Sequence, residues 1–320
     1  MTSDESKAGK RVVCLGEALV DFVCERPVDS LADADFFVPR QGGSLANIAV
    51  TAARLTDRVE MIGGAGDDEW GRWLRDRLAE QGVGVGRFVL KEGAGTSHAF
   101  VSVAGNGEPS FAFYGDPERP AAHAAEHLDP SLAGDPGVLV VGSDTLLGQA
   151  ERDVTMRAVA LARERGWKVL CDPNLRPNRW ESGDEMVRVI SELVAGATVV
   201  KLNEGEAQRL SGCASTEDAG RRILELGPRA VVVTRGEHGA LLLTESSIQH
   251  MDGVPVDVVD ATGAGDSVCG VIAAVLAADV PLHTGVIAAM RIAAGVVASW
   301  GATEGLPSAA AARGLLGADA

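Results

Sequence analysis

A carboxylate set inside a glycine-rich turn is the residue of this sequence whose chemistry stands out first. Asp266 closes the turn at residues 260–266 (DATGAGD), and apolar residues then recur with the spacing of an amphipathic helix. Such a turn aims free backbone amides and the positive helix end at an anion, and Gly263 and Gly265 leave room for a phosphate. Asp266 would repel that phosphate unless it takes a proton from an attacking hydroxyl. The spacing alone leaves open whether Asp266 is this base or a helix cap.

Two further stretches must position this turn. The apolar residues of 256–259 predict a buried strand directly before it. A second glycine turn, residues 41–44 (QGGS), precedes a helical pattern that begins at Leu45. Asn47 lies one turn into that helix on its polar side, where it can both donate and accept hydrogen bonds. Each glycine turn is therefore expected to open a helix whose first turn carries a polar side chain.

Polar residues follow the predicted strands of a βα alternation. Residues 12–15 predict a buried strand, and Asp21 comes shortly after it, either as a pocket residue or in a surface turn. Further strands are expected at 59–62, 138–141, 168–171, 198–202, 230–234 and 240–243, with helices at 149–165, 184–195 and after residue 203. This alternation predicts a parallel sheet with helices on both faces. A ligand site is expected beyond the strand ends, which carry Asp172, Asn174, Asn203, Thr234 and Asp260.

One hairpin interrupts the alternation. Residues 99–103 and 110–114 read as short strands, and the link between them, residues 104–108 (AGNGE), contains the Asn-Gly pair typical of hairpin turns. No helical pattern follows this hairpin directly. We therefore expect it to leave the main sheet and to act as a lid.

Several other patterns have simpler interpretations. Trp70 and Trp73 fall on the apolar stripe of a helix expected from Asp67, so packing is favoured over a binding platform. Residues 82–86 are rich in glycine and predict a loop, without the context of a dinucleotide fingerprint. Residues 123–127 (HAAEH) match the spacing of inverted zinc proteases, but no third ligand is evident, so an exposed short helix is favoured.

Composition limits the class of protein. The 320 residues are 46% hydrophobic and 23% charged, as in globular proteins, with a net charge of −16 and no basic run. We expect no nucleic-acid or anionic-membrane partner. The five cysteines form no C-x-x-C pair and are expected to be reduced and mostly buried. The first ten residues lack a signal-peptide core and the apolar run at 271–276 is too short to span a bilayer, so a cytoplasmic location is expected.

Taken in order, these motifs resemble the ribokinase-like (PfkB-type) carbohydrate kinases and, within them, the fructokinases. Residues 42–47 (GGSLAN) and 260–266 resemble the two signatures of the family. Five further segments resemble the fructokinase branch: residues 14–21, 111–114, 172–176 with Trp180, 201–206 and 234–239. The resemblance runs from about residue 11 to 307, which leaves 1–10 and 308–320 as tails.

The resemblance implies a fold and an activity. The fold would be a ribokinase-like α/β sandwich, with a central, mostly parallel sheet flanked by helices and a small β lid built from about 17–41 and 97–114. The activity would be transfer of the γ-phosphate of ATP to a sugar hydroxyl with Mg²⁺, and relatives also imply K⁺ and a homodimer formed through the lid. The 6-hydroxyl of fructose is the first expectation for the acceptor. The alternatives are another sugar or sugar acid (2-keto-3-deoxygluconate, ribose, a nucleoside) and a non-catalytic family member.

The resemblance also implies roles for individual residues. Asp266 would be the general base, with the amides of Gly263, Ala264 and Gly265 as the anion hole. The sugar would be held by Asp21, Gly42, Gly43 and Asn47, with Asn174 and Arg176 facing the sugar or the transferring phosphate. The nucleotide and its phosphates would meet Lys201, Asn203, Thr234, Gly236 and Gly239. Glu206 would bind Mg²⁺, directly or through water, and Asp260 would serve a monovalent cation.

Three departures from the family pattern concern the cation and the sugar. Ala261 stands where the family usually has Thr, which removes one hydroxyl beside the anion turn. Ser44 and Leu45 replace a small residue and a proline. Residues 115–123 lose the usual Arg and Ala-Asp of fructokinases beside the sugar, so the chemistry is expected to persist while the choice of sugar is open.

Overall fold

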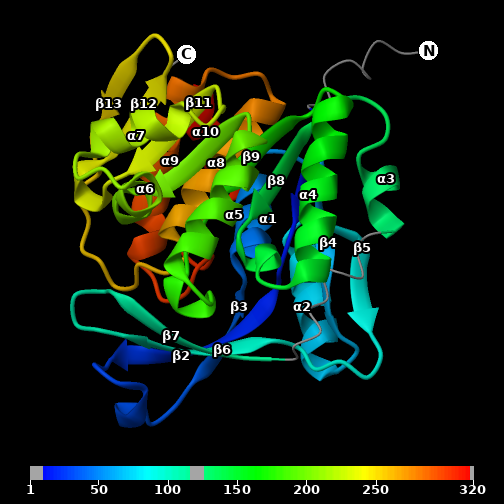
Figure 1. The fold of residues 1–320 in the computed structure, drawn as a ribbon. Helices are drawn as coiled ribbons and strands as arrows, with labels where there is room; N and C mark the ends of the chain where they lie inside the picture. The colour runs from blue at the N-terminus through cyan, green and yellow to red at the C-terminus, as the bar shows by residue number, and fades with distance from the viewer. Residues whose placement is uncertain (1–9, 116–125, 318–320) are drawn as a thin grey trace.

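The computed structural model describes residues 10–115 and 126–317, and a nine-stranded sheet forms its centre (Figure 1). The strand order is β13-β12-β11-β10-β9-β8-β1-β4-β5, and the strands from β11 to β5 run parallel. Their bounds are β1 Val12–Leu15, β4 Val59–Gly66, β5 Gly84–Lys91, β8 Val138–Gly142, β9 Lys168–Asp172, β10 Val199–Asn203, β11 Ala230–Thr234, β12 Ala240–Thr244 and β13 Ile248–Met251. The expected α/β architecture is therefore confirmed.

Helices cover both faces of this sheet because its strands are apolar on both sides. One face packs against α1 (Ser44–Ala53), α2 (Glu69–Glu80), α8 (Ala264–Ala277), α9 (Leu282–Val297) and α10 (Ala309–Gly317). The other packs against α3 (Leu128–Ser131), α4 (Gln149–Glu164), α5 (Gly183–Ala195), α6 (Glu204–Ser211) and α7 (Thr216–Leu224). Within the described residues, no helix combines the length and apolar content needed to cross a membrane.

A second sheet of four strands, called the small sheet below, lies against one end of the main body (Figure 1). Its order is β3-β2-β6-β7, with bounds β2 Leu19–Pro27, β3 Val38–Gly42, β6 His98–Val103 and β7 Pro109–Tyr114. Strands β6 and β7 form the antiparallel hairpin expected from the Asn-Gly turn. Arg40 of β3 joins this sheet to the body, because it pairs with Glu25 on β2 and with Glu304 in the segment after α9.

The two faces of the small sheet differ in character. Because side chains alternate along a strand, Asp21 shares the inner face with a cluster of apolar residues, and that cluster is Leu19, Val23, Ala99, Val101, Val103, Phe111, Phe113 and Trp300. The outer face carries Phe22, His98, Phe100 and Tyr114. Asp21 is thus placed by the pleat of β2, in the middle of a strand, and not at the strand end that the sequence had indicated.

The tip of the β6–β7 hairpin rests on the chain just before α8. The amide of Ala261 donates a hydrogen bond of 2.9 Å to the carbonyl oxygen of Gly107, which has φ +83° and packs against Val258. Residues 256–259 are not the buried strand expected from their apolar character. Val256 and Val258 are 39% and 46% exposed, because this segment crosses from the edge strand β13 to the turn without a neighbouring strand to pair with.

Other expectations have mixed outcomes. Strand β5 begins at Gly84, inside the expected loop, because β4 provides a partner for it. Helix α2 begins at Glu69 with Asp68 as its cap, not at Asp67. Trp73 packs on the core as expected, whereas Trp70 is 38% exposed and meets Phe22 edge-on.

All five cysteines are free and all but Cys213 are buried, as expected. His123 and residues 116–125 lie outside the described residues.

The docked hairpin tip yields a prediction about local stability. Replacing Gly107 by Val puts a branched side chain at positive φ against Val258, so the tip should undock. We expect the Ala261 amide to exchange its hydrogen at least about tenfold faster, as a loss of about 1.4 kcal/mol in local protection implies. Hydrogen exchange read by mass spectrometry or NMR measures this. Gly105→Ala in the same loop, where a Cβ meets nothing, is the control, and equal exchange in the two variants would contradict the docking.

Candidate active site

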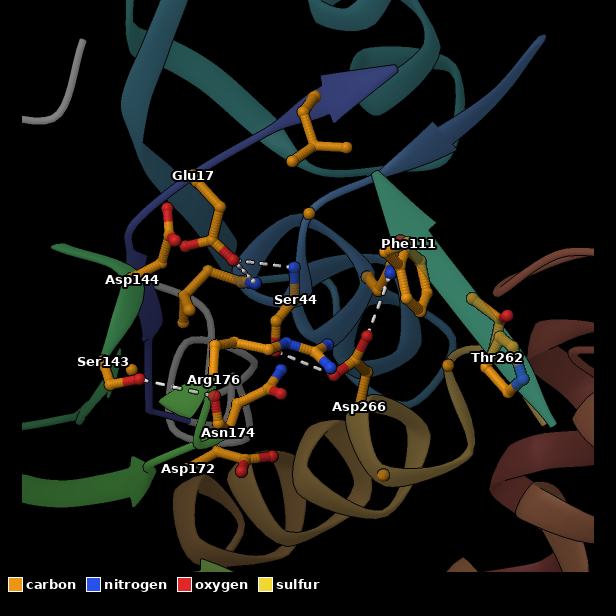
Figure 2. A pocket seen from close by; sticks show the side chains of 18 of the residues that line it. Glu17, Ser44, Phe111, Ser143, Asp144, Asp172, Asn174, Arg176, Thr262 and Asp266 are labelled. Atoms are coloured by element: carbon orange, nitrogen blue, oxygen red, sulfur yellow. Dashed lines mark hydrogen bonds between the residues drawn. The ribbon is translucent and has the colours of Figure 1, made fainter. Parts of the chain in front are cut away.

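The N-terminal ends of α1 and α8 meet, and their meeting point holds Asp266 (Figure 2). The helices approach closely because α8 has a glycine facing α1: a Cβ on Gly270 would lie 2.5 Å from Cβ of Thr51. Oδ1 of Asp266 accepts a hydrogen bond of 2.8 Å from the Ser44 hydroxyl, and Oδ2 accepts one of 2.9 Å from Nδ2 of Asn47. The carboxylate is thereby oriented by the neighbouring helix, which a simple cap of its own helix would not require.

The backbone conformation of the turn before α8 is fixed by contacts with residues 301–302. Gly263 is the N-cap of α8 with φ +78°, and a Cβ there would lie 2.5 Å from the carbonyl oxygen of Ala302. Asp260 is fully buried, and its two carboxylate oxygens accept 2.9 Å bonds from the amides of Thr262 and Gly301. At the start of α8, the amide of Ala264 donates a 3.3 Å bond to the carbonyl oxygen of Ala261, whereas Gly263 and Gly265 line the cavity and leave their amides as the donors for a ligand.

A cavity of about 260 Å³ opens in front of Asp266. It lies between the carboxyl ends of the parallel strands and the inner face of the small sheet. The structure brings to it the predicted residues Asp21, Gly43, Asn47, Asn174, Arg176, Lys201, Asn203, Glu206, Gly263, Gly265 and Asp266. Six predicted residues do not line this cavity: Gly42, Thr234, Gly236, Gly239, Asp260 and Ala264. Of these, Thr234 ends β11 directly beside Asn203.

Asp21 is a buried acid inside this cavity. Its side chain is accommodated because Gly42, on the neighbouring strand β3 and paired with Leu19, has no Cβ to occupy the same space. Asp21 is 4% exposed, and Oδ1 has no hydrogen-bond partner among the described residues. Burial raises the pKa of Asp21 to about 8, and the negative charges of Asp266 and Asp260 add to the effect. An acceptor that lacks a partner fits a ligand with hydroxyl groups to donate.

Glu17 is a site residue that the sequence did not single out. Its Oε1 accepts bonds of 2.8 and 3.4 Å from the amides of Ser44 and Leu45, so it caps α1 directly behind the residue that holds Asp266. Burial, followed by the charge of Asp144, raises the pKa of Glu17 to about 8. Glu17 and Asp144 follow the ends of β1 and β8, the same strand-end position that drew attention to Asp172, so this rule could have found both.

Beneath the turn, β9 and β10 contribute a buried ion pair. Nζ of Lys201 lies 3.0 Å from Oδ2 of Asp172, and both side chains are inaccessible to solvent. Burial raises the pKa of Asp172 to about 7 even though Lys201 opposes the shift. Asp172 is a second residue that reaches the cavity without a role assigned from the sequence.

Asn203 and Glu206 form a capping box at the start of α6. Oδ1 of Asn203 accepts a 2.9 Å bond from the Glu206 amide, and Oε2 of Glu206 accepts a 2.8 Å bond from the Asn203 amide. Oε1 of Glu206 accepts another 2.8 Å bond from the amide of Leu175. Both carboxylate oxygens are therefore already engaged, and each keeps one lone pair for a water molecule.

Two arginines link the body to the small sheet through aromatic rings. The guanidinium carbon of Arg176 lies 5.3 Å from the ring centre of Phe111, and that of Arg179 lies 4.9 Å from the ring centre of Phe113. Arg179 also forms an ion pair with Asp144. Residues 111–114 entered the sequence analysis only as a strand and as part of the family resemblance. The site contacts of the two phenylalanines and of Arg179 were not predicted, because contacts between a hairpin and a distant loop leave no periodic pattern.

Comparison with known proteins places this site in a family. The model of the pfkB family carbohydrate kinase matches residues 9–309. The chain belongs to this family of carbohydrate kinases. Fructokinase-1 of Zea mays is 35% identical over 260 residues, which cover 81% of this chain and 80% of the relative. Probable fructokinase-4 of Arabidopsis thaliana is 34% identical over 260 residues, with the same coverage.

Solved structures of pfkB kinases share the fold. A double mutant of the fructokinase of Vibrio cholerae O395, in a fructose, ADP and potassium ion bound form, superposes with a TM-score of 0.85 at 30% identity and covers 97% of this chain and 99% of that one. Aminoimidazole riboside kinase of Salmonella enterica, complexed with aminoimidazole riboside and an ATP analogue, gives 0.81 at 28% identity, with 96% and 99% covered. The ribokinase-like fold and an ATP-dependent carbohydrate kinase activity follow for this pfkB chain.

The buried Asp21 gives this pfkB kinase a predicted dependence of stability on pH. Because its folded pKa is raised to about 8, the native state keeps a proton that the unfolded chain releases from about pH 4 upward. Stability should therefore fall as pH rises through this window. We expect the free energy of unfolding in urea to drop by about 2 kcal/mol more between pH 6 and pH 8 in the wild type than in Asp21→Asn.

Asp35→Asn is the matched control for this pH prediction. Asp35 is exposed and its pKa is lowered by a hydrogen bond from Arg26, so it titrates below the window. Replacing Asp35 should leave the change in the free energy of unfolding between pH 6 and pH 8 as it is in the wild type. If Asp21→Asn also kept the wild-type change, the Asp21 carboxyl would not be the titrating group.

Proposed function

We propose that this pfkB kinase transfers the γ-phosphate of ATP to the 6-hydroxyl of fructose, with Asp266 as the general base. The observation that carries the proposal is the carboxylate of Asp266, fixed by Ser44 and Asn47 at the start of α8 in the same cavity as Asp21. Phosphoryl transfer needs little more than a positioned hydroxyl, an acceptor for its proton and positive charge around the phosphate.

The position of each residue in the site suggests its role in the reaction. Asp266 takes the proton of the attacking hydroxyl, while Ser44 and Asn47 keep the carboxylate turned toward it. The amides of Gly263 and Gly265 face the phosphoryl oxygens as charge develops on them, and that of Ala264 joins them by exchanging its 3.3 Å bond to Ala261 for one to the phosphate. Sugar hydroxyls donate to Asp21 and bond to Asn47, close to Gly42 and Gly43. Asn174 and Arg176 lie between the sugar and the phosphate, and Asn203, Thr234, Gly236 and Gly239 face the nucleotide.

The described residues fit Mg²⁺ through water. Glu206 has both oxygens bound to backbone amides, and Oδ1 of Asp172 is a buried acceptor without a partner among the described residues, so both suit the hydrogens of metal-bound water. Bound Mg²⁺ would neutralise charge on the phosphates. Asp260 differs from Glu206, because it is fully buried, does not line the cavity and has its two oxygens bound to the amides of Thr262 and Gly301, so no step here depends on K⁺.

Fructose is favoured over a sugar acid by the charges around the sugar end of the cavity. Glu17, Asp21 and Asp144 line it, and Asp144 already pairs with Arg179. The hydroxyls of a neutral polyol can donate to these acids, whereas the carboxylate of a sugar acid would have to compete with Asp144 for Arg179. The identity of about 35% to fructokinases points the same way. The atypical residues 116–123 lie outside the described chain, so ribose and other neutral sugars remain the alternative.

We propose that the small sheet acts as a lid over the bound sugar. Its inner face supplies Asp21, Phe111 and Phe113 to the cavity, and Arg176 and Arg179 hold the two rings against the body. Closure would keep water away from the γ-phosphate.

We further propose a homodimer formed through the outer face of the small sheet, where Phe22 stacks on Phe100 beside Phe37 and the 56% exposed Tyr114. Exposed clusters of this kind mark interfaces, and a second copy offers the same apolar face. We expect Tyr114→Asp to convert a dimer to a monomer in sedimentation velocity runs. Val254→Asp, a change at another exposed apolar residue, should leave the mass unchanged. A wild-type monomer at micromolar concentration would refute the proposal.

The proposed function is tested by an assay that couples ADP release to a visible signal. Purified enzyme with ATP and Mg²⁺ is offered fructose, ribose, glucose, adenosine and 2-keto-3-deoxygluconate, in K⁺ and in Tris buffer without K⁺. We expect fructose to be preferred and Asp266→Asn to lose roughly two to four orders of magnitude in kcat while still binding ATP. Asp279→Asn, just beyond the opposite end of α8, is the control and should keep its rate.

The outcomes of this assay test the choice of sugar, the role of Asp266 and the need for K⁺ separately. Preference for another sugar would keep the chemistry and overturn the choice of fructose. Full turnover by Asp266→Asn would remove the base from the mechanism. Equal rates with and without K⁺ would agree with the engaged oxygens of Asp260.

A further inference from the structure

Lys201 occupies an unusual place for a lysine, at the floor of the cavity. It is 3% exposed, and its ammonium lies directly under the first turn of α8. A Cβ on Gly265 would stand 2.5 Å from Nζ, so glycine is needed at that position for the ammonium to reach the turn. The lysine is therefore in contact with the segment that carries the anion-binding amides.

The surroundings keep this side chain charged. Burial alone would favour the neutral amine, but the carboxylates of Asp172 and Glu206 outweigh it and raise the pKa of Lys201 above its usual value. Buried ion pairs cost desolvation energy, and apolar replacements are often as stable or more so. A need for stability does not readily account for such a pair.

The hydrogen bonds of the pair are incomplete. An ammonium has three N–H donors, and within the described chain Asp172 accepts the one recorded bond from Lys201, at 3.0 Å. The remaining donors lie at the wall of the cavity that also contains Gly263, Gly265 and Asp266. Water or a ligand in the cavity can accept the remaining bonds, and the helix start beside them favours a ligand that is an anion.

We propose that Lys201 is a further residue of the phosphoryl-transfer site: held by Asp172, its ammonium compensates the charge that develops on the phosphoryl group above the Gly263–Gly265 turn. The inference rests on the kinase function proposed above. It gives Asp172 a positioning role, since Asp172 acts by fixing the ammonium. It also explains why the chain needs no lysine in a glycine-rich phosphate loop, because the charge arrives from the neighbouring strand β10.

The test compares binding of ADP with binding of a transition-state mimic. Lys201→Met removes the charge and keeps the length of the side chain. We expect kcat to fall about 100-fold, as for loss of one anion-hole donor, with the KM for fructose, or for whichever sugar of the panel the wild type phosphorylates, changed less than about threefold. Affinity for ADP with aluminium fluoride and that sugar should fall by the same factor as kcat, and affinity for ADP alone should change little. Lys168→Met, which removes a lysine bound to Asp279, is the matched control.

A double variant separates catalysis from folding. Lys201→Met alone strands a buried carboxylate and lowers stability, whereas Lys201→Met with Asp172→Asn removes both charges and should restore the melting temperature. We expect the double variant to stay slow. Recovery of kcat together with stability would show that the pair is only structural and would overturn the proposal.

The remaining outcomes distinguish failure of this inference from failure of the proposed function. Equal loss of affinity for ADP and for the aluminium fluoride complex would assign Lys201 to nucleotide binding and not to the transition state. A wild-type enzyme that phosphorylates no sugar would contradict the proposed function itself. An active wild type with an equally active Lys201→Met would contradict only this inference.

Discussion

A carboxylate held between the starts of two helices is the interaction on which the rest of this structure depends. Asp266 belongs to α8, but its two hydrogen bonds come from Ser44 and Asn47 of α1, so the proposed base is in place only while the two helices touch. Gly270 permits that contact, and Glu17 caps α1 at the residue that binds Asp266. Both helix ends contribute positive potential at the same point, which lets a carboxylate and a phosphate approach one another.

The site works with an excess of acids, and burial controls what they do. Glu17, Asp21 and Asp172 all lie in the cavity wall, and burial raises the pKa of each. Protons on Glu17 and Asp21 reduce the repulsion that an incoming polyphosphate would meet, whereas the charge of Asp172 is balanced by Lys201. The cations are few and each is bound to a partner: Lys201 to Asp172, Arg179 to Asp144, and Arg176 to the ring of Phe111. Positive charge is thus fixed in position before any ligand arrives.

The sequence predicted the parts of this molecule that depend on local pattern. The two glycine turns, the alternation of strands and helices and the hairpin at residues 104–108 all have periodic or turn signals, and the structure confirms them. The strand expected at 256–259 is absent because apolar residues alone cannot form a strand without a neighbour to pair with. Glu17 and Asp144 follow strand ends and could have been found by that rule, whereas the importance of Arg179 comes from its contacts with Asp144 and Phe113, which are distant in the sequence or on another sheet. Residue roles came from family resemblance, since spacing left Asp266 between two interpretations.

In the proposed lid, the bond between the hairpin tip and the turn at residues 260–266 would link the timing of closure to the readiness of the anion site. Ala261, which follows the buried Asp260, donates its amide to the carbonyl oxygen of Gly107. Any movement that lifts the hairpin breaks this bond at the entrance of the turn. An open molecule would then differ from a closed one in the turn itself as well as in its access to water. Wasteful hydrolysis of ATP would be restrained twice, by the exclusion of water when the hairpin is down and by an incomplete anion site when it is up.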